Sequence, residues 1–207
     1  RPLQTYGMNW QEKRVSLYRT HSDNIGRPAT LRDVIMSAGL QDISTLIELR
    51  KLDPEQRGYK ALTYPHKGLL QAFTPAALLA TKEKEHVKVI EMSGMLQLDF
   101  DYESIKQYDI EEVKRAVFAL PFIGFCGLSC SGTGFYALAA IGDTQKLTQY
   151  AEHCFEIFKE YSIPVDTSKG RNPQDLRYVS YDKNMLIREN PEVLHVTNFR
   201  TKAIPKE

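Results

Sequence analysis

The stretch that decides the fold is Leu96-Gln97-Leu98-Asp99-Phe100-Asp101-Tyr102, an apolar run that ends on two aspartates two positions apart. In a β-strand, residues i and i+2 point to the same face, so Asp99 and Asp101 are expected to lie side by side. Neighbouring carboxylates repel each other and are costly to desolvate unless a cation lies between them. The segment therefore predicts a strand that ends at a divalent-metal site. The alternative is a strand end whose aspartates simply face water.

Composition limits the class of protein. The chain has 207 residues, enough for one large α/β domain or two small ones. It contains 27 Lys and Arg against 26 Asp and Glu, for a formal net charge of +1. This balance excludes a polycation that binds nucleic acid through bulk charge, but it permits a local basic groove.

Neither a membrane segment nor a disulfide framework is predicted. The longest apolar stretch, residues 116–130, is interrupted by Pro121 and is too short to span a bilayer. The start of the chain has no cleavable signal pattern. The three cysteines are odd in number and lack a C-x-x-C pair, as expected for reduced thiols. We therefore expect a soluble cytoplasmic protein with no membrane partner.

The chain is expected to form one domain with two parts. Residues 1–85 are predicted to be mainly helical and to pack on the core, with a short strand at 14–18 and helices at 28–36 and 43–52. Residues 86–207 are predicted to be an α+β core. Its predicted strands and helices, in chain order, are 87–92, 95–101, the helix 109–120, 122–128, 135–141, the helix 144–161 and 176–181. This order resembles a split βαβ core.

A second motif, Ser129-Cys130-Ser131-Gly132-Thr133-Gly134, joins two of these strands. Small residues and hydroxyls in a turn leave backbone N–H groups free to bind an anion such as a triphosphate. The motif is not a Walker loop, because it has no G-K-[ST] and a strand follows it. The alternative is an ordinary tight hairpin connection.

A third group lies further along the chain. Asp166 follows Pro164 at the end of a predicted helix, where it could join Asp99 and Asp101 as a third metal ligand. Arg177 could clamp a phosphate oxygen. The alternatives are a turn or cap role for Asp166, and an ion pair of Arg177 with Asp175 or Asp182.

Taken in order, these motifs resemble the archaeo-eukaryotic primase–polymerase superfamily. Within it, the sequence is most similar to the amino-terminal domain of virulence-associated-E-like proteins of Bacteroidetes and their mobile elements. The recurring family text is an apolar D-x-D strand, an S-x-S-G-x-G hairpin and a D-x-S … R-x-x-S-Y-D ending. The matching segments here are Asp99-Phe100-Asp101, Ser129 to Gly134, Asp166-Thr167-Ser168 and Arg177 to Asp182. The resemblance covers about residues 95–182.

The resemblance implies a primase–polymerase-like α+β fold, with a mixed or antiparallel RRM-like sheet flanked by helices. It implies two Mg²⁺ or Mn²⁺ ions held by Asp99, Asp101 and Asp166. The candidate nucleotide-binding residues are Ser129, Ser131, Gly132, Gly134, Tyr136 and Arg177. The implied activity is template-directed synthesis or extension of primers from nucleoside triphosphates during DNA replication. A fused or associated helicase is an expected partner.

One departure from the family concerns the strand after the hairpin. Active members usually carry a histidine there, in an S-x-H or G-x-H motif, whereas this chain has Gly134-Phe135-Tyr136. Tyr136 stands at the histidine position, or Phe135 does in an alternative register. A tyrosine hydroxyl can bind a phosphate but has no positive charge at neutral pH. Two alternatives follow: a catalytically decayed nucleotide- or nucleic-acid-binding module of a larger replication or mobile-element protein, and a two-metal phosphodiesterase.

The first part of the chain has an aromatic and basic texture. Trp10, Tyr59 and Tyr64 could stack nucleobases, or they could be partly buried packing residues. A group of cations could follow a nucleic-acid backbone or form a solvated helix face: Lys51, Arg57, Lys60 and Lys67. The five histidines have no metal-ligand spacing and are expected to be surface or packing residues.

Overall fold

A computed structural model describes residues 9–36 and 43–196 of the chain. The elements up to residue 92 are η1 (Trp10–Glu12), β1 (Arg14–Tyr18), β2 (Arg27–Thr30), α1 (Leu31–Ile35), α2 (Ile43–Arg50), α3 (Tyr59–Gly68), β3 (Ala72–Thr74), β4 (Ala77–Thr81) and β5 (Lys88–Met92). The later elements are β6 (Met95–Phe100), α4 (Tyr102–Ile105), α5 (Ile110–Phe118), β7 (Ile123–Leu128), β8 (Phe135–Ala140), η2 (Thr144–Lys146), α6 (Leu147–Glu160), β9 (Arg177–Tyr178) and β10 (Leu186–Ile187).

The central sheet has the strand order β10-β7-β8-β6, and every neighbouring pair is antiparallel. Asp166 forms a single antiparallel bridge with Asp99 on the free edge of β6. The succession β6, α5, β7, β8, α6 and this bridging residue follows the order of a split βαβ unit. The predicted α+β class with an antiparallel sheet is therefore confirmed.

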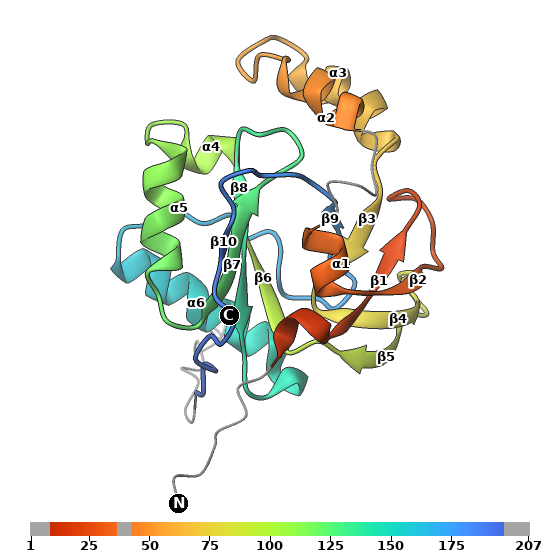
Figure 1. Cartoon of the computed structure of the whole chain (residues 1–207), viewed down its shortest axis with the longest axis vertical. Helices are drawn as coiled ribbons and strands as arrows, with labels where there is room; N and C mark the ends of the chain where they lie inside the picture. Colours follow the sequence, from red (N-terminus) through yellow and green to blue (C-terminus); the bar gives the residue numbers. More distant parts are fainter. Residues whose placement is uncertain (1–8, 37–42, 197–207) are drawn as a thin grey trace, which may run out of the picture.

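Alternate residues of the central strands enter two different cores. Leu98, Phe100 and Phe135 face α5 and α6, where they pack with residues such as Phe158. Tyr136 and its neighbours on the other face pack against the N-terminal strands and α1. Figure 1 shows α5 and α6 on one side of β6, β7 and β8, and β1 to β5 with α1 on the other side. Both faces of the central sheet are thus covered.

A second sheet has the order β2-β1-β3-β9. The prediction that residues 176–181 form the last strand of the central sheet is wrong, because β9 pairs with β3 through Ala72–Tyr178 and Phe73–Arg177. The free edge of β6 is instead bridged by Asp166. As a result, β9 belongs to the N-terminal sheet, and its Arg177 contacts Asp99 near the end of β6.

The N-terminal part is less helical than predicted, because it contributes β1 to β4 as well as three helices. The predicted helix 28–36 begins only at Leu31, since the Thr30 side chain accepts a hydrogen bond from Asp33 N at 3.0 Å and caps α1. Pro28 lies in the edge strand β2, where a missing N–H is tolerated.

Helices α2 and α3 lie together at one end of the molecule, above β3 in Figure 1. Leu46 and Leu49 of α2 pack with Leu70 and Cys130, so this helical arm rests on the predicted hairpin motif. Trp10 is fully buried and its Nε1 donates to Arg188 O at 2.9 Å, so of its two alternatives the packing role is the one observed. Within the part of the chain that is described, no helix has the length and apolar character needed to cross a membrane.

Candidate nucleotide-binding site

A cavity of about 430 Å³ opens at the end of β6, between the central sheet and the N-terminal part. Six of the nine site residues predicted from the sequence line it: Asp99, Asp101, Ser129, Ser131, Gly134 and Arg177. They come from β6, the hairpin and β9, so three motifs that are far apart in the chain meet in one place. Gly132, Tyr136 and Asp166 are not among its lining residues.

Arg177 is the buried cation of the site. Its Nη1 donates to Asp99 Oδ1 at 2.9 Å, its Nε to Gln97 Oε1 at 3.3 Å, and its guanidinium lies 5.0 Å from the centre of the Tyr136 ring. The predicted alternatives, pairing with Asp175 or Asp182, are therefore wrong. Burial lowers the pKa of Arg177, but the Asp99 carboxylate more than offsets this, so the pKa rises and the charge is retained.

The second terminal nitrogen of Arg177, Nη2, is buried and forms no hydrogen bond with the described residues. The residue is only 9% exposed, and it lines the cavity. Buried donors are nearly always paired, so this guanidinium nitrogen is a donor for which the described residues supply no acceptor.

Asp99 and Asp101 differ in their surroundings although both line the cavity. The side chain of Asp99 is 17% exposed and forms an ion pair with Arg177. It is therefore not a water-facing strand end. Asp101 caps α4, where its Oδ1 accepts a hydrogen bond from Ser104 N at 3.0 Å. Asp99 is thus neutralised by a protein cation, whereas Asp101 is held by backbone and hydroxyl donors.

Asp166 is adjacent to Asp99 through the backbone, because Asp166 N donates to Asp99 O at 2.8 Å. Its carboxylate bonds locally: Oδ1 accepts from Ser168 N and Oδ2 from Ser168 Oγ, both at 2.8 Å. This is the turn role that was the alternative for Asp166.

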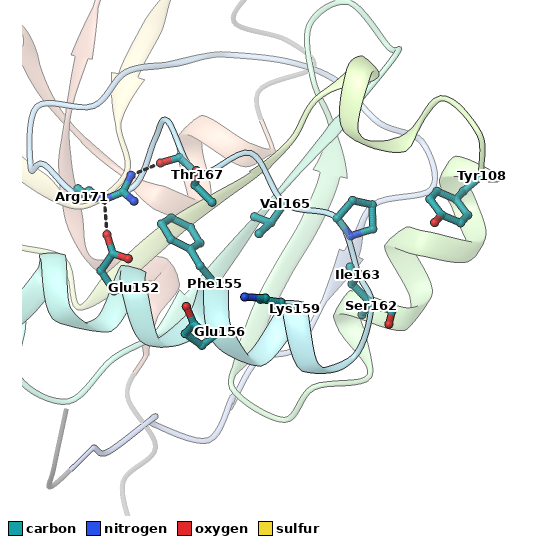
Figure 2. Close-up of a pocket in the computed structure, with 11 residues that line it drawn as sticks. Tyr108, Glu152, Phe155, Glu156, Lys159, Ser162, Ile163, Val165, Thr167 and Arg171 are labelled. Carbon is teal, nitrogen blue, oxygen red and sulfur yellow. Dashed lines mark hydrogen bonds and ion pairs between the residues drawn. The ribbon is translucent and has the colours of Figure 1, made fainter. Parts of the chain in front are cut away.

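The loop that carries Asp166 is anchored to α6 by Arg171, as Figure 2 shows. Arg171 Nε donates to Glu152 at 2.6 Å, Nη1 donates to the Thr167 carbonyl, and the guanidinium lies over the Phe155 ring. A second cavity of about 430 Å³ lies between this loop and α6, and none of the predicted site residues lines it. Arg171 therefore positions the loop, while the predicted chemistry lies in the other cavity.

The fit to a divalent metal can be judged from the donors. Carboxylate oxygens are the hard ligands that Mg²⁺ and Mn²⁺ prefer, and Asp99 and Asp101 present them in one cavity. Among the described residues, however, no three or more His, Cys, Asp or Glu side chains are grouped to hold a metal ion. Two of the three predicted ligands therefore line the cavity, whereas the carboxylate of the third, Asp166, bonds to Ser168.

The hairpin presents a row of hydroxyls to the cavity. Ser129 Oγ lies 3.1 Å from Ser131 Oγ, which lies 2.9 Å from Thr133 Oγ1. The loop itself is closed by Ser129 N donating to Gly134 O and Gly132 N donating to Ser129 O, both at 2.9 Å. All three hydroxyl residues line the cavity, so the turn supplies neutral donors for an anionic ligand.

The two glycines of the motif are required for different structural reasons. A Cβ on Gly134 would lie 2.4 Å from Phe100 O, so only glycine allows β8 to approach β6 here. Gly132 has φ 71°, a left-handed conformation that favours glycine, and it faces the side chain of Arg50. Gly132 therefore shapes the turn, and Gly134 both permits the strand contact and lines the cavity.

Arg50 of α2 holds the hairpin in place. Its Nη2 donates to Ser129 O at 3.2 Å, Ser180 Oγ at 3.0 Å and Tyr181 O at 2.6 Å, and its Nε donates to Cys130 O at 3.3 Å. Burial is the main influence on Arg50 and lowers its pKa. No local signal identifies this residue in the sequence, because its partners lie about 80 and 130 positions away.

The end of the third motif supports the other side of the hairpin. Asp182 Oδ2 accepts from Lys114 Nζ at 2.8 Å and from Leu128 N at 3.1 Å, and both side chains of the ion pair are buried. The Arg177 to Asp182 segment therefore contacts the site at three points: Arg177 binds Asp99, Ser180 and Tyr181 accept from Arg50, and Asp182 tethers the start of the hairpin.

Tyr136 lies beneath Arg177 and does not face the cavity. It is 3% exposed and packs against Phe125, with ring centres 5.1 Å apart, and against Phe73. Burial raises its pKa well above the ordinary tyrosine value, so the hydroxyl stays protonated. Tyr136 thus supports Arg177 from below, and the predicted contact between Tyr136 and a nucleotide is absent from this arrangement.

Three further basic side chains line the cavity: His21, Lys67 and Lys169. His21 follows β1, Lys67 lies on α3, and Lys169 lies on the loop after Asp166. The sequence predicts Lys67 as a member of a basic group and His21 as a surface or packing residue, and no motif marks Lys169. Lys67 and Lys169 add positive charge around the motif residues.

None of the known family models, curated proteins or solved structures matches this chain. The functional interpretation therefore depends on the cavity and on the order of its motifs.

Proposed function

We propose that the chain is a nucleotidyltransferase of the primase–polymerase type, which binds a nucleoside triphosphate in the cavity at the end of β6. The observation that carries this proposal is the meeting of Arg177 with Asp99, 78 positions away, beside the hydroxyl row of the hairpin. Arg177 retains an unpaired buried Nη2 there. A cation, neutral hydroxyl donors and carboxylates in one cavity are the groups needed to hold a triphosphate and a metal ion.

The phosphates are assigned to the basic side of the cavity. Arg177 offers a guanidinium nitrogen in a fixed orientation, which suits a phosphate oxygen. Lys67 and Lys169 line the same cavity and compensate further negative charge. A volume of about 430 Å³ falls within the range of small-molecule sites, which is about 300–1,000 Å³.

Asp99 and Asp101 would hold a Mg²⁺ or Mn²⁺ ion. Such an ion, when bound, favours ionisation of a primer 3′-hydroxyl and stabilises charge on the phosphates. In the transfer, the 3′-oxygen bonds to the α-phosphorus, the bond to the bridging oxygen breaks, and pyrophosphate leaves with its electron pair. The hydroxyl proton passes to solvent. Arg177 and the hairpin hydroxyls are placed to stabilise the leaving pyrophosphate. A nucleic-acid template with its primer and a fused or associated helicase are the partners that belong to the same proposal.

A second candidate function is nucleotide binding without turnover, in a module of a larger replication or mobile-element protein. The Asp99–Arg177 ion pair favours it, because the pair occupies an oxygen that a metal ion would need. The burial of Tyr136 also favours nucleotide binding without turnover, because β8 carries no histidine that could take part in catalysis. Binding would then depend on Arg177 and the hairpin and would not require a metal.

The two candidates are separated by measuring synthesis and binding on the same protein. Primer extension is followed with a labelled primer–template, nucleoside triphosphates and Mn²⁺, and binding with a non-hydrolysable triphosphate. We expect Asp99→Asn and Asp101→Asn to abolish extension. Asp143→Asn, the same change at an exposed cap of η2, is the matched control and should extend normally.

Each outcome has a distinct meaning. Extension by Asp99→Asn at the wild-type rate would contradict the transferase proposal. Binding by the wild-type chain without any product would support the binding module. Shortening of the labelled strand would identify the phosphodiesterase alternative, which uses the same carboxylates.

A further inference from the structure

Three aromatic rings from different segments meet at the edge of the cavity. The centre of the His21 ring lies 6.0 Å from Tyr64 and 5.9 Å from Tyr178, with interplanar angles of 76° and 62°. His21 and Tyr178 line the cavity. We call His21, Tyr64 and Tyr178 the aromatic rim. Tyr178 directly follows Arg177 in β9, so the rim is continuous with the phosphate side of the proposed site.

Two members of the rim are held in place by the fold. Lys82 Nζ donates to the main-chain oxygen of His21 at 3.0 Å, and Tyr178 is paired with Ala72 in the second sheet. The His21 Nδ1 is buried and has no partner among the described residues. The position of the imidazole is therefore set by its ring contacts and main chain and not by a side-chain hydrogen bond.

Tyr64 is the open member of the rim, because it is 66% exposed although its ring contacts His21. Its exposure is close to that of Tyr161, which lies at the end of α6 and is 64% exposed. Tyr64 differs from Tyr161 in its place: its ring contacts His21, which lines the cavity together with Arg177 and the hairpin hydroxyls. Aromatic rings beside a buried cation and hydroxyl donors match a molecule with a ring system at one end and negative charge at the other.

We propose that the aromatic rim binds the nucleobase of the nucleotide whose phosphates lie at Arg177 and the hairpin. This inference rests on the proposed function and names the part of the ligand that each side of the site recognises. Stacking on aromatic side chains tolerates every base, because each base has a π-face. His21 and Tyr64 of the N-terminal part thus join Tyr178 of β9 on the base-binding side, and Arg177 of β9 joins the β7–β8 hairpin on the phosphate-binding side.

The test compares two ligands that differ in the base. A non-hydrolysable nucleoside triphosphate carries a base and phosphates, whereas inorganic tripolyphosphate carries the phosphates alone. Equilibrium binding of both is measured on the wild-type chain, Tyr64→Ala, Tyr64→Phe and the control Tyr161→Ala. Tyr64 is exposed, so its replacement should leave the melting temperature unchanged.

We expect Tyr64→Ala to weaken binding of the nucleoside triphosphate about ten-fold, the scale of one lost stacking contact, and to leave tripolyphosphate binding unchanged. Tyr64→Phe keeps the ring and should bind both ligands like the wild type, as should Tyr161→Ala. Unchanged nucleotide affinity in Tyr64→Ala would overturn the base-binding role while leaving the proposed function standing. Equal weakening of both ligands would also overturn it. Failure of the wild-type chain to bind either ligand would overturn the proposed function and the rim together.

Discussion

The two faces of the central sheet share the same strands but hold different chemistry. On the helical face, Phe100 and Phe135 stack with their ring centres 4.4 Å apart and are fully buried. On the opposite face, the neighbouring residues Asp99 and Tyr136 lie directly across from each other. Asp99 is tolerated there because Arg177 neutralises it, since a carboxylate without a partner would be costly in this environment. Adjacent residues of the same strands therefore point to opposite faces, one of which is packed with aromatic rings while the other carries the site.

The largest expected effect comes from breaking the helical face. Phe100→Ala removes a ring that packs against Phe135 and Phe158, and the cavity left behind cannot be filled by water. We expect the free energy of unfolding to fall by about 3–5 kcal/mol. Urea-induced unfolding measures the change, with Phe118→Ala on the partly buried edge of α5 as a milder comparison. A loss below about 1 kcal/mol would contradict the division between the faces.

A smaller loss of stability, with loss of ligand, is expected on the site face. Arg177→Met keeps an apolar stem but leaves the largely buried Asp99 carboxylate without its cation. We expect the free energy of unfolding to fall by about 2 kcal/mol and triphosphate binding to disappear. The double variant Asp99→Leu/Arg177→Met should recover part of the stability without recovering binding, because an apolar pair has no desolvation cost. Recovery of both properties would show that the ion pair serves the fold alone.

The helical face should also lose stability at alkaline pH. Cys126 and Cys154 are buried there, and burial raises the pKa of both thiols, to about 12 for Cys154. The folded chain keeps these protons above the ordinary thiol pKa of about 8.5, whereas the unfolded chain releases them. Unfolding then releases protons, so stability falls as the pH rises, by about 1 kcal/mol per thiol over the first pH unit above 8.5. The free energy of unfolding of Cys154→Ala should vary less steeply with pH than that of the wild type; parallel curves would contradict the assignment.

The smallest effect is expected for Tyr136→Phe. The hydroxyl of Tyr136 forms no hydrogen bond with the described residues, while its ring contacts Phe73, Phe125 and Arg177. Removing the hydroxyl should change the free energy of unfolding by less than about 0.5 kcal/mol and leave triphosphate affinity unchanged. A marked loss of affinity would show that Tyr136 reaches the ligand.

The sequence predicted the core of the chain well where signals are local. The alternation of Met95 to Phe100 and the small residues of the Ser129–Gly134 turn marked β6 and the β7–β8 hairpin, and Asp109 marked the start of α5 as its cap. The N-terminal part was predicted less well. Its strands β2, β3 and β4 are only three to five residues long, and short segments with mixed patterning carry little period-2 signal.

By itself, the sequence determined the α+β order of the core, the strand that ends in Asp99 and Asp101, and the hydroxyl-rich hairpin beside it. These features depend on side-chain period, on capping and on turn-forming residues, all of which act within a few positions. Only the tertiary structure decided that Arg177 binds Asp99, that Tyr136 turns inward, and that His21 and Arg50 join the site. Those contacts depend on which sheet receives β9 and on how the N-terminal strands cover the central sheet. That choice is made by packing over the whole chain, so no local pattern encodes it.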